Sequence, residues 1–282
     1  MRPFFQWRGG KSWLWNDIKS ELIEGLKHHD TYIEPCLGGG AIAIQLLDYC
    51  KQNNIKRKFI LNDANERMMD AYRYVQTDVD GLIRRLHELD ETYQGSRRRF
   101  IERRDQMNQM ESCLERAALF IWVAANVWRG VYRINKKGHM NVGPDDHPRV
   151  HCFDEANMRQ LHELFQDVDF RCGSFDDIKE DGLIYLDPPY EATIKEYTTK
   201  DPTQDQVNAY INTHKPSTIL ISNSTSYTPP DNAERLLLTS LYHHYQRTHK
   251  QGEVVYKIPH TLGTPITGFQ PSILGPFHSP QY

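Results

Sequence analysis

The sequence predicts an α/β fold with an open parallel sheet, and three observations support this prediction. Residues 31–49 read as a strand, a glycine turn and a helix, which is the βα unit of doubly wound sheets. The apolar run 183–186 is short and β-prone, and an acid follows it, as happens at the sheet edge where such folds keep their sites. Residues 80–127 read as helical without further strands, so we interpret them as an insertion into a Rossmann-like sheet.

Composition excludes several classes of protein. The 282 residues suffice for one large domain or two modest ones, and 39% of them are hydrophobic. The mean hydropathy of −0.68 and the lack of an apolar run of about 18 residues predict a soluble protein without a membrane span. The first residues lack the apolar core of a signal peptide. The five cysteines form no C-x-x-C pair, so we expect reduced thiols in the cytoplasm and no metal site.

Charge is distributed unevenly along the chain. The formal net charge is −3, which by itself speaks against a nucleic-acid partner. Residues 121–140, however, include arginines and lysines but no acid, and a second arginine-rich set lies at 97–104. A local basic stripe, rather than the total charge, is the footprint of nucleic-acid binding.

The first segment expected to reach a ligand is 6–11, Gln-Trp-Arg-Gly-Gly-Lys, just before a helix that starts near Ser12. Its glycine pair lets the backbone approach a ligand closely, and Lys11 could then face a carboxylate or a phosphate. An N-terminal arm packed by its aromatic side chains is the alternative.

The βα unit that follows has a strand ending near Pro35, a turn at 38–40 and a helix over 41–49. A second strand, 58–63, ends in Asp63 about 20 residues past the turn, a spacing that suits a carboxylate bound to ribose hydroxyls. The glycines do not match G-x-G-x-x-G, so NAD is not indicated, whereas any adenosine-bearing cofactor, S-adenosylmethionine included, fits the pattern. A structural turn followed by a solvated acid is the alternative.

The remaining elements follow from periodicity and turn signals. Two short strands around Lys136-Lys137-Gly138 predict a basic β-hairpin, which can lie in the major groove of duplex DNA. A solvated surface hairpin is the alternative. We expect helices at 65–74, 96–109, 111–127 and 153–165, strands at 169–172, 218–222 and 251–258, a helix running into a strand over 235–245, and an irregular tail from 262.

The stretch Asp187-Pro188-Pro189-Tyr190 follows the 183–186 strand and organises the predicted site. Neither proline has a backbone N–H and each fixes its own φ, so this corner is rigid and rich in acceptors. The Asp187 carboxylate and the Pro188 carbonyl could accept both protons of one NH2 group, with Tyr190 against the flat ring that carries it. Such a grip favours a more tetrahedral nitrogen whose lone pair can attack. A proline-rich turn capped by Asp is the alternative.

Taken together, these segments resemble the Dam family of DNA adenine-N6 methyltransferases (D12 class) over roughly residues 3–258. The likeness is carried, in the family's order, by Gln6 to Lys11, Glu34 to Gly40, Leu61 to Asn65, Arg133 to Asn135 with Gly138 and Asn141-Val142, Asp187 to Tyr190, and Ile221 to Ser224.

The resemblance implies a Rossmann-like S-adenosylmethionine-dependent methyltransferase domain formed by 1–75 and 165–262, a helical and β-hairpin target-recognition insertion at 76–164, and an irregular tail at 263–282. It implies methyl transfer to adenine N6 in duplex DNA, at GATC or a related site, without a metal. It also implies a cytoplasmic protein of a bacterial or phage-infected cell, with restriction-modification among its roles. The enzyme would act as a monomer, with a dimer on DNA as the alternative.

Site residues also follow from the resemblance. Catalysis would depend on Asp187, Pro188, Pro189 and Tyr190. Cofactor contacts would come from Trp7, Lys11, Cys36, Gly38, Gly40, Asp63, Ser174, Phe175 and Asp187. The target base must leave the stack to reach this site. The DNA would contact Gln6, Trp128, Arg129, Arg133, Asn135, Lys136, Lys137 and Asn141, with Trp128 filling the vacated gap and Arg133 reading a guanine.

Four departures from the family pattern bear on the GATC target rather than on the reaction. Gln6 stands where the family often has a lysine that helps to read an outer guanine, and Arg129 stands where a small polar residue is usual. Residues 143–146, Gly-Pro-Asp-Asp, replace a Pro-Phe-Gly-Arg-like stretch, and Cys36 replaces a phenylalanine.

Three other functions stay open at this point. Methylation of cytosine N4, an RNA adenine or a protein glutamine would use a related corner, but Asp187 favours adenine by resemblance and the basic hairpin favours duplex DNA. A DNA-binding module with a decayed site conflicts with the intact corner and with Asp63. A nicotinamide dehydrogenase is the most distant alternative, which cofactor binding would distinguish.

Overall fold

The structure is a computed structural model, and it describes residues 1–93, 95–146, 151–190, 202–239 and 253–259. Its centre is a seven-stranded sheet in the order β3-β2-β1-β4-β5-β7-β6. The strands are β1 (Thr31–Glu34), β2 (Lys58–Asp63), β3 (Val168–Cys172), β4 (Leu183–Leu186), β5 (Thr218–Ser224), β6 (Glu234–Thr239) and β7 (Glu253–Ile258). The first five are parallel, and β7 is antiparallel to both β5 and β6. Strand order therefore reverses between β1 and β4, the switch point of a doubly wound sheet.

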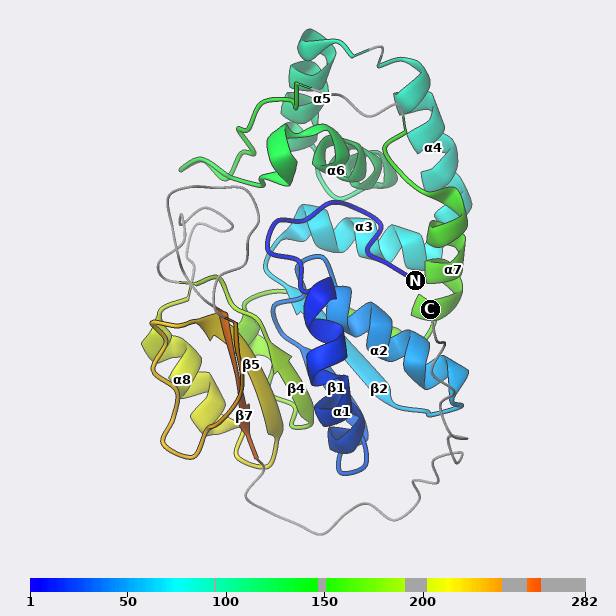
Figure 1. Ribbon diagram of the computed structural model, residues 1–282. Helices are drawn as coiled ribbons and strands as arrows, with labels where there is room; N and C mark the ends of the chain where they lie inside the picture. Colours follow the sequence, from blue (N-terminus) through cyan, green and yellow to red (C-terminus); the bar gives the residue numbers. More distant parts are fainter. Residues whose placement is uncertain (94, 147–150, 191–201, 240–252, 260–282) are drawn as a thin grey trace, which may run out of the picture.

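Helices cover both faces of this sheet (Figure 1). Three short 3-10 turns accompany them, at Ser12–Leu14, Trp128–Gly130 and Phe175–Asp177. The helices are α1 (Trp15–Gly25), α2 (Ala41–Gln52), α3 (Glu66–Thr77), α4 (Val79–Glu91), α5 (Arg97–Gln109), α6 (Leu114–Asn126), α7 (Glu155–Phe165) and α8 (Gln204–Thr213).

The alternating direction of side chains along the strands explains why each face of the sheet has its own buried cluster. In β2, Phe59 and Leu61 belong to a buried cluster with α1, α2 and α3, while Ile60 belongs to a second cluster with α8. Alternate residues of a strand point to opposite faces, so each face of the sheet receives its own apolar set. Every residue of β4 and β5 is buried, as expected for central strands covered on both sides.

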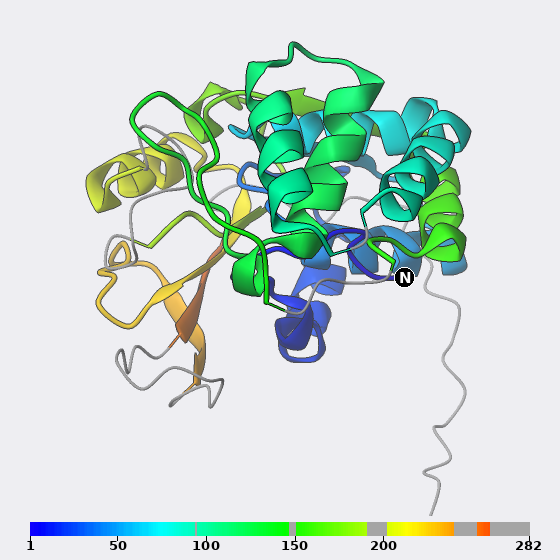
Figure 2. The same cartoon turned by 90° about the horizontal axis from the view of Figure 1, so that it is seen from above.

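Helices α4, α5 and α6 form a further layer above α3 (Figure 1). A buried ion pair joins this layer to α3. The Arg116 guanidinium of α6 donates from Nε to the Asp70 carboxylate of α3 over 2.7 Å, and from Nη1 to Glu66 over 3.1 Å. The Arg116 and Asp70 side chains are only 4% and 1% exposed. Seen from above, the chain after α6 extends toward the side of the molecule that carries α8, β5 and β7 (Figure 2).

Most predicted elements are present, and three predictions need correction. The hairpin has isolated bridges, Ile134 to Met140 and Val127 to Pro144, instead of two strands. The side-chain oxygen of Asn135 accepts from the backbone N–H groups of Lys137 and His139. Backbone bonds from the Asn135 N–H to the His139 carbonyl and from the Asn141 N–H to the Arg133 carbonyl also cross the hairpin, but this pairing is too short to form two strands.

A helix running into a strand was predicted over 235–245, and its helical start is wrong, because residues 234–239 form strand β6. Residues 240–245 lie outside the described residues. The leucine run of β6 suits either structure, and pairing with β7 decides between them. Helix α8 was not predicted, although its capping box, Thr203 with Gln206, is a recognisable start signal. The predicted tail from 262 lies outside the described residues.

Replacing Arg116 with Met should lower the free energy of unfolding by about 3–5 kcal/mol, because the buried Asp70 carboxylate would lose its ion-pair partner. Denaturant titration measures this change. Arg98→Met is the matched control, since Arg98 pairs with Glu102 on the exposed face of α5 and its loss should have a much smaller effect. Adding Asp70→Leu to Arg116→Met should recover most of the loss. A cost for Arg116→Met no larger than that of the control would contradict this account.

Candidate active site

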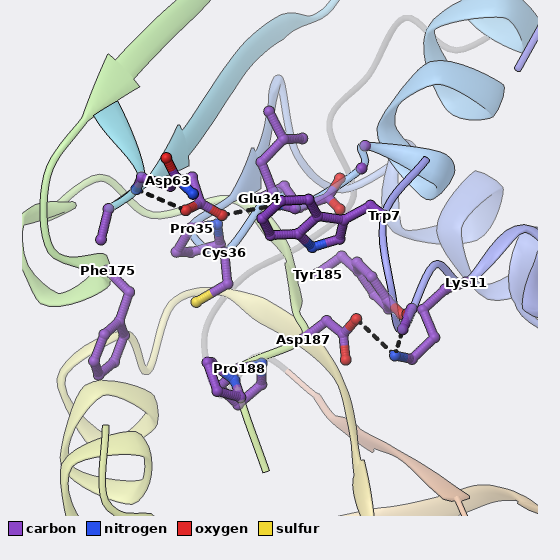
Figure 3. A pocket seen from close by; sticks show the side chains of 18 of the residues that line it. Trp7, Lys11, Glu34, Pro35, Cys36, Asp63, Phe175, Tyr185, Asp187 and Pro188 are labelled. Atoms are coloured by element: carbon purple, nitrogen blue, oxygen red, sulfur yellow. Dashed lines mark hydrogen bonds and ion pairs between the residues drawn. The ribbon is translucent and has the colours of Figure 1, made fainter. Parts of the chain in front are cut away.

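A cavity of about 410 Å³ lies at the carboxyl ends of β1 and β4, at the switch point of the sheet (Figure 3). Every residue predicted for catalysis or cofactor binding lines it. Its walls come from the N-terminal arm (residues 7–11), the β1–α2 turn (34–42), the end of β2 (63–65), the turn 174–176 and the corner 187–190. The volume is in the range of sites for small molecules and cofactors, about 300–1,000 Å³.

The glycine turn is shaped by its neighbours. Gly38 and Gly40 have φ angles of 51° and 65°, which other residues rarely adopt. A Cβ on Gly40 would lie 2.6 Å from the Tyr72 hydroxyl oxygen, and that hydroxyl donates to the Gly38 carbonyl over 3.0 Å. The Trp7 side chain closes on the turn, 3.0 Å from where a Cβ on Gly38 would lie. The turn therefore presents bare backbone to the cavity.

Asp63 fixes the same turn from the end of β2. One carboxylate oxygen accepts from the Gly38 N–H and the other from the Asn65 N–H, each over 2.9 Å. Burial raises the pKa of Asp63, and these backbone donors partly offset that effect. A carboxylate has further lone-pair sites, so binding of ribose hydroxyls by Asp63 stays compatible with this arrangement and stays a prediction.

The corner carboxylate is held from three directions. Asp187 Oδ2 lies 2.9 Å from the Lys11 ammonium, while Oδ1 accepts from the Ser222 hydroxyl over 2.7 Å and lies 3.3 Å from the Tyr190 hydroxyl. Ser222 in turn lies 3.0 Å from the Tyr185 hydroxyl. Two oxygens offer about four lone-pair sites, so the carboxylate keeps acceptor capacity toward the cavity that it lines.

Lys11 faces carboxylates, one of the two partners predicted for it. Its Nζ also lies 3.2 Å from Glu253 Oε1 and donates to the Gly9 carbonyl over 2.8 Å. Burial alone would lower the pKa of Lys11, but the charges of Asp187 and Glu253 outweigh it and raise that pKa. The ammonium is therefore charged, and it places a positive charge beside the corner.

Glu253 was not predicted as a site residue. It is the first residue of β7, and antiparallel pairing with Ser224 of β5 brings it beside the corner. Its Oε1 accepts from the Tyr190 hydroxyl over 2.5 Å. No sequence motif signals this role, because only the register of β5 and β7 brings residue 253 beside residue 187.

Burial raises the pKa of two further acidic groups. The pKa of Glu34 lies well above its usual range, and the charges of Asp187 and Asp63 add to this, although a hydrogen bond from the Tyr32 hydroxyl opposes it. Burial and the same carboxylates raise the pKa of the Cys36 thiol well above its usual range. A thiol with a raised pKa is a poor nucleophile.

Ser174 and Phe175 form the remaining wall. The Ser174 and Asp177 side chains make a reciprocal capping box over the Phe175–Asp177 turn. The Phe175 ring packs on Tyr210 of α8 with centroids 5.3 Å apart, so it offers a fixed apolar surface.

The residues predicted to contact DNA lie outside this cavity, mostly on the loop after α6 (residues 127–146). Trp128 is 39% exposed, and the Arg129 guanidinium lies over its ring at 4.9 Å. Arg133 Nε donates to the Asn141 side chain over 2.9 Å. The Lys136 and Lys137 side chains are exposed.

This loop adjoins the arm that lines the cavity. A Cβ on Gly130 would lie 2.9 Å from the Gln6 side chain, and the Trp7 and Tyr132 rings lie 5.2 Å apart. The loop and the cavity are therefore connected through residues 6 and 7. Within the described residues, no cluster of three or more His, Cys, Asp or Glu side chains could hold a metal ion, and no helix has the length and apolarity to cross a membrane.

A doubly wound sheet with a cavity at its switch point defines the class of protein as one that binds a ligand there. The family model for the D12 class of N6 adenine-specific DNA methyltransferases matches residues 7–254. The chain belongs to this family, and it is therefore an adenine-specific DNA methyltransferase.

Curated relatives agree with this assignment. The chain is 33% identical to the type II methyltransferase M.MjaIII of Methanocaldococcus jannaschii over 224 residues, covering 73% of this chain and 76% of that one. It is 28% identical to the DNA adenine methylase of Escherichia coli K12 over 193 residues, covering 67% of this chain and 65% of that one. It is 25% identical to the retron Ec67 DNA adenine methylase of E. coli, covering 87% and 83%.

Glu34 should make stability depend on pH in a definite direction. The folded protein holds the Glu34 proton to a higher pH than the unfolded chain does, so the stability that Glu34 contributes is fully present below the unfolded pKa, about 4.3, and is lost as pH rises through the folded pKa. Across that window, the unfolding free energy of wild type relative to Glu34→Gln should fall by up to about 1.4 kcal/mol per pH unit. Urea titrations at successive pH values measure this difference. A constant difference from about pH 4 to about pH 8 would mean that Glu34 ionises alike in both states.

Proposed function

We propose that this protein transfers the methyl group of S-adenosylmethionine to N6 of an adenine flipped out of duplex DNA, within a specific short sequence. The observation that carries the proposal is the corner itself. Asp187 is oriented by Lys11 and Ser222 at the edge of a cavity of cofactor size, next to two prolines that have no N–H to donate.

The cavity residues suit the proposed methyl donor. The bare backbone of the 38–40 turn can approach the ligand closely, and Phe175 offers an apolar surface for a flat base. Asp63 lies about 20 residues past the glycine turn, where a carboxylate can accept from ribose hydroxyls. The donor supplies an electrophilic methyl group on a sulfonium. The protein supplies the alignment, which is worth roughly 7–11 kcal/mol of the barrier in well-oriented systems.

The corner acts on the amine. The Asp187 carboxylate and the Pro188 carbonyl would accept hydrogen bonds from the two N6 protons, which draws the nitrogen lone pair out of conjugation with the ring. As the N–C bond forms, the S–C bond of the donor breaks, and the methylated amine then loses one proton to solvent. Positive charge grows on that nitrogen as it attacks, and a fixed carboxylate stabilises this charge. Tyr190 lies against the base, and Pro189 keeps the corner rigid. No covalent enzyme intermediate is required, since the amine itself attacks.

The loop after α6, within a recognition insertion at 76–164, would supply the DNA contacts. Extruding a base costs a few kcal/mol, and phosphate contacts from Lys136, Lys137 and their neighbours offset that cost. Trp128 is exposed and would occupy the gap that the base leaves. Arg133, oriented by Asn141, would read a guanine through its O6 and N7 atoms.

The target is GATC or a related site, and Gln6 and Arg129 are the residues that would alter it. We further infer a cytoplasmic enzyme that acts as a monomer, with a dimer on DNA as the alternative.

The test is methylation-sensitive sequencing of DNA incubated with the protein and S-adenosylmethionine. We expect N6-methyladenine within one recurring sequence. Asp187→Ala should lower the single-turnover rate at least roughly 10²–10³-fold, because the amine loses its charged acceptor. Asp181→Ala is the matched control, since Asp181 lies just before the opposite end of β4, where its carboxylate accepts from the Ser217 hydroxyl over 2.9 Å. Methyl groups on cytosine or on RNA, or an Asp187→Ala variant with full activity, would overturn the proposal.

A further inference from the structure

Glu253 stands behind the corner and touches two of the residues that line the cavity. Its Oε1 lies 3.2 Å from the Lys11 ammonium and accepts from the Tyr190 hydroxyl over 2.5 Å. Glu253 itself is not part of the cavity wall. The contacts of Glu253 with the cavity wall include Lys11 and Tyr190, and its charge also acts on Asp187.

The Lys11 ammonium is shared between two carboxylates. It lies 2.9 Å from Asp187 and 3.2 Å from Glu253, and its side chain is only 9% exposed. If Glu253 lost its charge, the ammonium would interact with Asp187 alone. Asp187 would then be a weaker acceptor for a substrate amine, because its charge would be more fully neutralised.

The Tyr190 hydroxyl also lies between the two carboxylates. It is 2.5 Å from Glu253 and 3.3 Å from Asp187, and a hydroxyl has one proton to donate. The shorter contact shows that this proton is directed to Glu253. Glu253 therefore keeps the proton of Tyr190 off Asp187 and fixes the orientation of the Tyr190 ring, which also lies 5.3 Å from the Lys11 ammonium.

We infer that Glu253 is a positioning residue for methyl transfer: it draws Lys11 and the Tyr190 hydroxyl toward itself, and so leaves the Asp187 carboxylate available to the target amine. The inference rests on the proposed function of the corner and adds a residue that no motif indicates. Among the described residues, the charged and titratable groups that face Glu253 include Lys11, Asp187, Tyr190 and, more distantly, Tyr185. Burial raises the pKa of Glu253, so its protonation falls closer to the working pH range than that of an exposed glutamate.

The activity test compares Glu253→Gln with wild type in single-turnover methylation. We expect the rate to fall roughly tenfold to a hundredfold, as for loss of a charged hydrogen-bond partner, with unchanged affinity for DNA. The ratio of wild-type to Glu253→Gln rates should approach one in acid, because protonated Glu253 resembles glutamine. Glu21→Gln is the matched control. Glu21 of α1 pairs over 2.7 Å with Lys257, which lies on β7 like Glu253, and this ion pair is remote from the cavity.

A double-mutant cycle separates positioning from a structural role. If Glu253 acts through the Tyr190 hydroxyl, Glu253→Gln combined with Tyr190→Phe should be no slower than the slower single variant. Rate losses that multiply would remove Tyr190 from the inference, and a Glu253→Gln rate equal to that of the Glu21→Gln control would overturn it.

A measurement on the free protein keeps this test independent of the proposed function. With ring-labelled tyrosine, the 13Cζ resonance of Tyr190 is identified by its loss in Tyr190→Phe. This resonance should shift in Glu253→Gln and stay in place in Glu21→Gln. An unmoved resonance would remove the contact on which the inference depends, whereas a shifted resonance in a protein that fails to methylate DNA would refute only the proposed function.

Discussion

The ammonium of Lys11, shared by Asp187 and Glu253, is the interaction on which the site depends. Each carboxylate is largely buried, and a buried charge without a partner costs several kcal/mol. One ammonium offsets both costs, and in doing so it joins the N-terminal arm, the end of β4 and the start of β7. These segments lie far apart in sequence, so the corner is complete only when the sheet is fully assembled.

The same arm connects the chemistry to the predicted DNA surface. Trp7 closes on the glycine turn and lies 5.2 Å from the Tyr132 ring, while Gln6 packs beside Gly130. Lys11 follows four residues later, so residues 6–11 contact the loop after α6, the 38–40 turn and the Asp187 carboxylate in succession. A change in the loop on DNA therefore has a direct physical route to the corner, through packed side chains.

Sequence reasoning located most of the cavity because its residues belong to local patterns. The glycine turn, Asp63 and the corner each follow a buried strand, and parallel pairing brings their carboxyl ends to one edge. Glu253 was not predicted as a site residue, because its position depends on the register between β5 and β7, which no local pattern encodes. The helical part of the prediction for 235–245 failed for a related reason, since pairing with β7 decides the conformation of a leucine run. The hairpin was overestimated because its backbone pairing is limited to a few hydrogen bonds around the Asn135 turn.

A crystal structure with S-adenosylhomocysteine and a DNA duplex containing the methylated sequence tests the central claim most directly. The account predicts an extruded adenine whose N6 atom lies within hydrogen-bond distance, about 3 Å, of both the Asp187 carboxylate and the Pro188 carbonyl, with the cofactor sulfur on the side of the glycine turn. An adenine bound elsewhere, or an Asp187 side chain directed away from the base, would contradict it.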